Sequence, residues 1–598
     1  MDDTLGFSEQ EKKPSEEWHL GEGEESMSSV ASRFGPQNQD LQVIQKKEIP
    51  MDRPVIAATK WERLAYYRSF ATSQTKTQFL CMQQEDFRTY LLNYLINVFM
   101  KSFPTTYVYT FFSAYSPDSH FFISKILPIA YGSTIAFIVS AFIELVMVTL
   151  NTANYLHYFI VGLVYHSPWN RYCDNFFSRC NNVFCFYFIV LWIGAAASYT
   201  LFFKKFLWKI LNLTQMFLNI ILFVTFIHLT TVYFEKGFRK FGTYETKILE
   251  VMQNSDIDLL SESMTAPPII HILSSRSSEE NRPTQDSAII VTSNAIYYTF
   301  RGFVAYLLKL YCDNVMNTSL QDSYFSSQSL FYLWPIYFSQ FYLGDLFGIM
   351  FFLLNFINEY LVIVITLQCL IEAILSEWRW LRPWMVIITL SVLGVTSFYF
   401  TSSVFFETMY VFCTSVVTLF EIIIIFYIYP LSRLVDDMTF FNGIRPTKLR
   451  LLTFWAAPCF YMLKFYMMIT GFLTIVKFTN LAQEYPNYDK FIYSLAIPLV
   501  TGAIFAIYKY VFIMKMGWMQ LFKPLPNWGL KYFATRQLRK RYDSRFYVKS
   551  QVPRELSRYL IQKSELNEYK LDVRYDIISQ RPSQAIAQLD VEDEKKGL

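Results

Sequence analysis

Long apolar stretches alternate with shorter polar ones along most of the chain, and no polar face repeats within them. The run NEYLVIVITLQCLIEAILSEW (358–378) is typical, with a polar residue pair at its start and a Glu-Trp pair at its end. A helix of about 20 apolar residues is long enough to cross a bilayer. Comparable segments lie at 90–115, 128–165, 183–203, 210–233, 288–312, 329–375, 384–400, 404–429, 452–476 and 491–514. The pattern predicts an all-α multi-pass membrane protein with about ten transmembrane helices.

Polar stretches divide the chain into a membrane domain and its flanking parts. Residues 1–60 are rich in Glu, Ser and Gln and contain no apolar core of the kind a signal peptide needs, so we expect a disordered cytoplasmic tail. The transmembrane domain is predicted at 61–530, interrupted by a Ser- and Glu-rich soluble insertion at 234–287. Residues 531–598 are expected to form a cytoplasmic C-terminal tail.

Lys and Arg residues give the expected orientation, because they collect on the cytoplasmic side of membrane proteins. They occur in four places: Lys204, Lys205 and Lys209; Arg379 and Arg382; Arg433, Arg445, Lys448 and Arg450; and the tail from Lys515 onward. An even number of crossings between successive places puts all of them, and the C-terminus, in the cytoplasm.

The segment 329–375 decides whether that even count holds. At 1.5 Å per residue its helix would be about 70 Å long, too long for one pass and about enough for two. An even count therefore requires a short or re-entrant pass within 329–343, where Pro335 is expected to interrupt a helix.

Composition agrees with a membrane protein. Apolar residues make up 53% of the chain and charged residues only 17%, whereas soluble domains carry about 25% charged residues. The net charge of +4 is small, and we expect the lipid bilayer, and no nucleic acid, as a partner. No His/Cys metal spacing, nucleophile elbow or phosphate-binding Gly loop is present, so we expect neither an enzyme nor a cofactor.

Four stretches resemble the sodium:neurotransmitter symporter family, in the family's order. They are YLHYFIVGLVYHSPWNRYCDNFFSRC (155–180), EAILSEW (372–378), LFEIIIIFYIYPLSRLVDDM (419–438) and FKPLPNWG (522–529). In the third stretch the family's residues are matched by Glu421, Tyr429, Arg433, Asp436 and Asp437. The resemblance extends from about residue 60 to about residue 530 and is strongest after residue 329.

The resemblance implies a symporter-like inverted-repeat bundle, with two five-helix repeats plus two added helices. It also implies a plasma-membrane solute carrier for a small amino-acid-like solute. The family's ion and substrate sites lie mid-membrane, where the first helix of each repeat is broken.

At the site positions this sequence departs from the family. Aligned on EAILSEW, the family's sodium-binding Asp-Ser pair corresponds to Leu361 and Val362, which offer no side-chain oxygen. The family's substrate-binding Tyr of the third helix corresponds to Val148, and the glycines of the broken sixth helix are reduced to Gly302. The stretch 69–87, which corresponds to the first family helix, has no Gly or Pro and many polar residues. We therefore doubt sodium coupling.

Several polar residues could build a different cavity. Glu144, Arg301 and Glu407 lie in apolar segments, where charged side chains are costly and often functional. Together with 69–87 they could line a water-filled cavity. The alternative is that 69–87 is a surface segment and Arg301 extends toward a membrane interface.

Cys173 and Cys180 correspond to the cysteine pair of the family's extracellular loop, so the resemblance implies a disulfide bond between them.

Two functions remain open. One is transmembrane solute transport of the symporter type. The other is a non-transporting accessory or binding protein derived from that fold, with a protein partner. Convergence of the polar candidates on one cavity would favour transport, and their scattering would favour the accessory role.

Overall fold

The computed structural model describes most of the apolar segments and few of the polar ones. The described residues are 61–62, 64–66, 87–116, 121–164, 181–201, 204–240, 272–273, 275, 283–316, 330–378, 380–398, 417–442, 445–478, 499–525, 528–530 and 539. All of them belong to one compact unit, Val55–Leu598.

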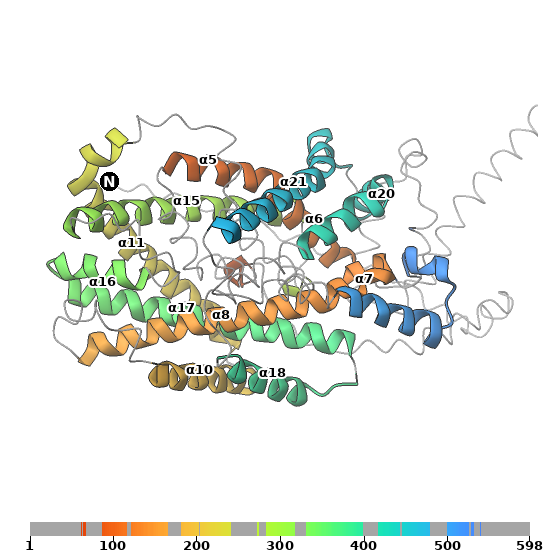
Figure 1. Cartoon of the computed structure of the whole chain (residues 1–598), viewed down its shortest axis with the longest axis horizontal. Coiled ribbons are helices and arrows are strands. Elements are labelled where there is room, and N and C mark those ends of the chain that lie inside the picture. The colour runs from red at the N-terminus through yellow and green to blue at the C-terminus, as the bar shows by residue number, and fades with distance from the viewer. Residues whose placement is uncertain are drawn as a thin grey trace, which may run out of the picture. The chain divides into compact units, whose positions relative to one another are not determined.

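Every regular element in the described part of the chain is a helix (Figure 1), which confirms the predicted all-α class. The α-helices are α5 (Phe87–Asn97), α6 (Phe103–Tyr115), α7 (Phe122–Ile126), α8 (Tyr131–Val164), α10 (Asn181–Leu201), α11 (Lys204–Lys240), α15 (Pro283–Met316), α16 (Leu330–Gln340), α17 (Gly344–Glu377), α18 (Pro383–Ser397), α20 (Leu431–Asn442) and α21 (Lys448–Phe478). Short π-helices lie at η1 (Val98–Ser102), η6 (Ile424–Ile428) and η7 (Tyr508–Ile513), and 3-10 helices at η2 (Pro128–Ala130) and η8 (Trp518–Phe522).

Several helices have the length and apolar composition of membrane spans. Among the described residues, three helices suffice to cross a bilayer by themselves: Pro128–Val164, Lys209–Val232 and Gly344–Glu377. A fourth candidate is a pair of helices that meet at an angle of 87°, Val417–Ile428 and Leu431–Phe441. Shorter apolar helices lie at Cys185–Ser198, Pro383–Ser397 and Leu499–Ile513. These helices support a multi-pass membrane protein, and the number of ten helices stays a prediction.

Helices α8 and α17 form the centre of the bundle. They lie along each other and make the most extensive contact between any two described elements (Figure 1). Helix α10 packs against both, α18 packs against α10 and α17, and α11 packs against α17 and α15. Because both central helices are covered on several sides, polar residues on them are shielded from solvent, and a polar group left there without a partner costs free energy.

The segment 329–375 forms one short helix and one long one. Helix α16 (Leu330–Gln340) has 11 residues and α17 has 34, so at 1.5 Å per residue their lengths are about 16 Å and about 51 Å. Only α17 is long enough to span a bilayer by itself. Pro335 lies inside α16, which continues through it, so the expected interruption at this proline is wrong.

The helices reach into the predicted soluble insertion 234–287 from both ends. Helix α11 extends to Lys240, and α15 begins at Pro283. Within the insertion, Ile272 and Leu273 are buried in the same hydrophobic cluster as residues of α8 and α17. This end of the insertion therefore contributes to the core.

Two glycines allow α8 and the helix Leu499–Ile513 to cross at close range. A Cβ atom on Gly132 would lie 2.5 Å from the carbonyl oxygen of Leu499, and a Cβ atom on Gly502 would overlap the backbone of Gly132. Since any side chain here would collide with backbone, both positions require glycine.

Candidate functional site

The positions aligned with the family's sodium and substrate ligands are occupied by aliphatic side chains. Leu361 and Val362 are buried on α17, which is an uninterrupted helix at this point. Val148 of α8 is partly buried and packs against the same hydrophobic cluster. Backbone carbonyls inside a regular helix are engaged in its own hydrogen bonds. These positions therefore present no free oxygen to a cation.

Gly302 and Arg301 lie on α15, which runs without a break from Pro283 to Met316. Both residues are buried, and Arg301 has only 1% of its surface exposed. A buried guanidinium requires neighbours that compensate its charge.

One acidic group near Arg301 is Glu359 of α17. This carboxylate is also 1% exposed and interacts electrostatically with Arg301. Neither of its oxygens accepts a hydrogen bond from any described residue. The guanidinium carbon of Arg301 lies 5.9 Å from the centre of the Tyr297 ring, and Tyr155 of α8 interacts electrostatically with both charges. We call Arg301, Glu359, Tyr155 and Tyr297 the charge-pair cluster; it joins α8, α15 and α17.

Sequence reasoning found Arg301 and missed Glu359. In the sequence Asn358 and Glu359 look like the polar start of an apolar run, whereas in the structure Glu359 lies near the middle of α17. The signal that could have found it was the preceding segment GDLFGIMFFLLNFI (344–357), which is apolar enough to extend the helix N-terminally.

Of the other residues expected to line a polar cavity, the structure describes only Glu144 and Phe87. Glu144 is half-buried on α8. Glu407 and, apart from Phe87, the stretch 69–87 lie outside the described residues. Cys173 and Cys180 also lie outside them, so their disulfide bond stays a prediction.

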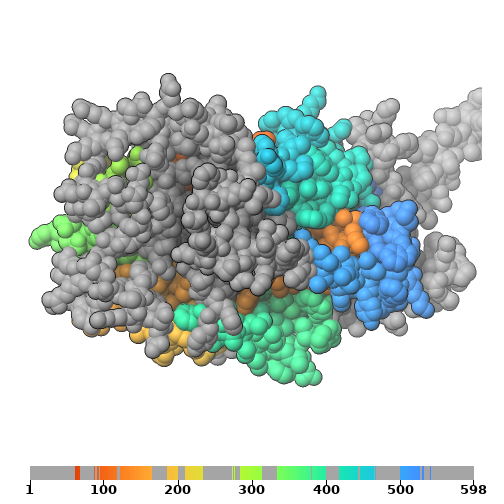
Figure 2. Space-filling view, viewed as in Figure 1, coloured from red at the N-terminus to blue at the C-terminus, as the bar shows by residue number. Residues whose placement is uncertain are grey.

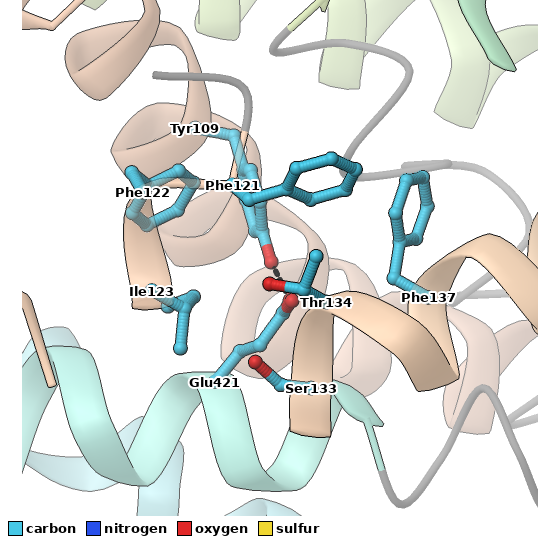
Figure 3. A pocket seen from close by; sticks show the side chains of 8 residues that line it. All are labelled: Tyr109, Phe121, Phe122, Ile123, Ser133, Thr134, Phe137 and Glu421. Atoms are coloured by element: carbon cyan, nitrogen blue, oxygen red, sulfur yellow. Dashed lines mark hydrogen bonds between the residues drawn. The ribbon is translucent and has the colours of Figure 1, made fainter. Parts of the chain in front are cut away.

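A second polar group lies between α6, α8 and the helix Val417–Ile428 (Figure 3). It surrounds a cavity of about 10 Å³, which is room for about one water molecule. Four side chains bring oxygen atoms to the cavity wall: Tyr109, Ser133, Thr134 and Glu421. The Tyr109 hydroxyl donates a hydrogen bond to Glu421. Three phenylalanines and one isoleucine form the rest of the wall.

A third polar group connects Arg539 to α6 and α20. Asp437 of α20 accepts hydrogen bonds from the hydroxyls of Tyr115 (3.0 Å) and Tyr429, and its carboxylate lies 2.5 Å from Nε of Arg539. The Trp528 indole N–H donates to the Tyr429 hydroxyl at 3.5 Å. In Figure 2 the segment 499–525 (blue) lies beside residues of the α7 region (orange), where the Leu525 N–H donates to the Lys125 carbonyl at 2.9 Å.

Comparison with known proteins establishes the fold. No protein-family model matches the chain, and no curated protein matches it. Among solved structures, the chain is similar to MhsT, crystallised in complex with L-phenylalanine, with a TM-score of 0.57 and 12% sequence identity. The match covers 69% of this chain and 99% of MhsT, which is a transporter of the neurotransmitter-symporter type. This chain therefore has the helical fold of a neurotransmitter-symporter-type transporter.

Proposed function

We propose that this protein transports a small solute across a membrane. The observation that carries the proposal is the fold, because the match includes 99% of MhsT and therefore all but a small part of a working transporter. A fold by itself does not fix a function, so the substrate class has to be argued from the side chains at the centre of the bundle.

The charge-pair cluster favours a solute that carries both charges, as an amino acid does. A guanidinium such as that of Arg301 binds carboxylates with two parallel hydrogen bonds. The Glu359 oxygens accept no hydrogen bond from the described residues and are available to an ammonium group. The cluster lies on α8, α15 and α17, the first and last of which form the central pair of the bundle. The neighbour MhsT was crystallised with L-phenylalanine, which agrees with an amino-acid-like solute here.

We further propose that the protein resides in the plasma membrane with a cytoplasmic C-terminus. The basic residues between the apolar segments support this orientation. The predicted Cys173–Cys180 bond would then lie in an extracellular loop, where disulfides persist.

Uptake by proteoliposomes tests the proposal. The purified full chain is reconstituted, and initial uptake is measured for a panel of radiolabelled amino acids and amines. We expect Glu359→Gln, which keeps the shape and removes the charge, to lower uptake at least about tenfold, because one lost charged contact is worth about 1.4 kcal/mol or more. Asp345→Asn is the matched control, because it removes a negative charge from an exposed position in the first turn of the same helix.

Two results would contradict the proposal at different levels. Equal uptake by the Glu359→Gln variant would refute the assignment of the substrate site and leave transport standing. No uptake of any panel member by protein that unfolds cooperatively would refute transport itself.

A second candidate function is a non-transporting accessory membrane protein. The observation that favours it is the packing of Leu361 and Val362 into the hydrophobic core at positions where the family binds sodium. A folded protein without flux, whose chemical cross-linking in native membranes yields one defined complex, would support this second function.

A further inference from the structure

The wall of the cavity between α6, α8 and the helix Val417–Ile428 is rich in oxygen atoms. Not all of these atoms form hydrogen bonds with described residues. Thr134 is only 2% exposed, yet its hydroxyl has no hydrogen-bond partner among the described residues. Thr149 and Thr152 of the same helix instead donate to the carbonyls of Leu145 and Val148. The carbonyl four residues before Thr134 belongs to Ala130 and already accepts a hydrogen bond from Ser133. Thr134 therefore keeps its hydroxyl available for an occupant of the cavity (Figure 3).

Glu421 brings a carboxyl group to this wall, and no described cationic side chain compensates a charge on it. Its side chain is 6% exposed and accepts the hydrogen bond from Tyr109. Burial is the only environmental effect resolved for Glu421, and no Lys, Arg or His among the described residues interacts with it electrostatically. A buried carboxyl group is neutralised either by a proton or by a partner of opposite charge. A water molecule would fill the space without supplying that charge.

We propose that this cavity binds one small alkali-metal cation, held by oxygen atoms of Glu421, Thr134, Ser133 and Tyr109. All four donors are hard oxygen ligands, which such cations prefer over nitrogen or sulfur. One carboxylate neutralises one positive charge, so a monovalent ion leaves the buried site neutral, whereas a divalent ion would not. The space for about one water molecule limits the occupant to a single dehydrated ion.

The bound cation would link three elements that are distant in sequence. Tyr109 lies on α6, Ser133 and Thr134 begin α8, and Glu421 lies on the helix Val417–Ile428. The site shares no residue with the charge-pair cluster, so it does not depend on the proposed transport function. Its effect is on the stability of the fold.

The test is the thermal unfolding of the purified full chain in detergent, at one fixed pH and ionic strength, in the chlorides of sodium, lithium, potassium and choline. We expect the midpoint to rise saturably with sodium or lithium relative to choline, because a ligand that binds the folded state stabilises it. Thr134→Val removes one ligand at constant shape and should raise the apparent dissociation constant at least about tenfold, since loss of even an indirect ligand contact weakens metal sites by about 10–100-fold. Thr149→Val, whose hydroxyl bonds only to its own helix, is the control that keeps the wild-type response.

Glu421→Gln should abolish the rise of the midpoint with sodium or lithium. If Glu421→Gln does not fold, Thr134→Val tests the same site. A midpoint that is the same in all four salts would overturn the proposal and leave water as the occupant. The series is then repeated at a lower pH. A midpoint that is the same in all four salts and rises at the lower pH would also overturn the proposal, because the neutralising species would then be a proton.

Discussion

Arg301 and Glu359 are each buried to 99% in a bundle whose other central residues are mainly apolar. Burial of one charge without the other would cost several kcal/mol, about 3–5 kcal/mol in measured cases. The aromatic neighbour Tyr297 moderates this cost, since ring faces attract a guanidinium. At the residue scale, the two charges therefore depend on each other for stability as well as for the proposed binding of solute.

A double-mutant cycle measures that dependence. We expect Arg301→Met and Glu359→Leu each to lower the free energy of unfolding by about 3–5 kcal/mol, because each removes one partner of their electrostatic interaction. The double variant should lose clearly less than the sum, since it removes both partners together. The measurement is denaturant unfolding in detergent; effects that add within about 0.5 kcal/mol would show that the two side chains do not interact.

The contacts between helices depend on small residues and on a few polar anchors. The crossing of α8 with Leu499–Ile513 requires the glycines at 132 and 502 because backbone meets backbone there. Nearby, Glu377 at the end of α17 accepts hydrogen bonds from Tyr131 and from Lys509, each at 2.9 Å. At the element scale, close packing and one anchored carboxylate together fix how three helices meet.

Substitution of Gly502 tests the close crossing. We expect Gly502→Ala to lower the free energy of unfolding by about 1–3 kcal/mol, because the added methyl group meets the backbone of Gly132 and forces the helices apart. Gly517→Ala is the control, since no atom lies within 4 Å of the Cβ position there. Thermal unfolding of both variants is the measurement, and equal midpoints would refute the crossing.

Substitution of Arg539 tests its ion pair with Asp437. Arg539→Gln removes the positive charge beside Asp437, whose side chain is 2% exposed, so we expect a loss of about 2 kcal/mol in unfolding free energy. Limited proteolysis should then cut the C-terminal segment faster. Lys523→Gln removes the same charge from an exposed position and should change neither quantity. If Arg539→Gln has the same unfolding free energy and the same rate of proteolysis as this control, the ion pair with Asp437 does not stabilise the fold.

The whole molecule combines a transporter fold with an altered interior. The match covers 99% of MhsT at 12% identity, so the arrangement of helices is similar while most side chains differ. Leu361 and Val362 fill one region of the core, and the charge-pair cluster supplies polar groups in another. At this scale, the proposed transport would proceed by rearrangement of the helices, driven by the solute gradient.

Solute uptake should not require a sodium gradient. The positions aligned with the family's sodium ligands carry aliphatic side chains, so an inward sodium gradient has no site there through which to act. Initial uptake by proteoliposomes should be the same with sodium chloride on both sides as with sodium chloride outside only. A sodium ionophore, which dissipates the gradient at constant external sodium, is the control. Accumulation that the ionophore abolishes would refute this prediction.

The sequence alone determined the structural class of the protein and indicated its resemblance to the symporter-type fold. Apolar runs and single helices are local properties of the chain, so hydropathy correctly predicted an all-α membrane protein, and the motifs at 372–378 and 419–438 pointed to the symporter-type fold. The absence of side-chain oxygens at Leu361 and Val362 was also readable directly from the residue types.

Only the tertiary structure decided which polar residues meet. Glu359 is found opposite Arg301 because α17 begins at Gly344, and a long apolar stretch does not reveal by itself where its helix starts. Tyr109 and Glu421 are 312 positions apart in the chain, and no local pattern encodes a contact over that separation. The cavity that they share with Thr134 exists only where four helices converge, since its walls come from α6, α7, α8 and the helix Val417–Ile428. Hydropathy specifies which segments are buried, whereas the pairing of charges and the shape of cavities depend on how those segments pack.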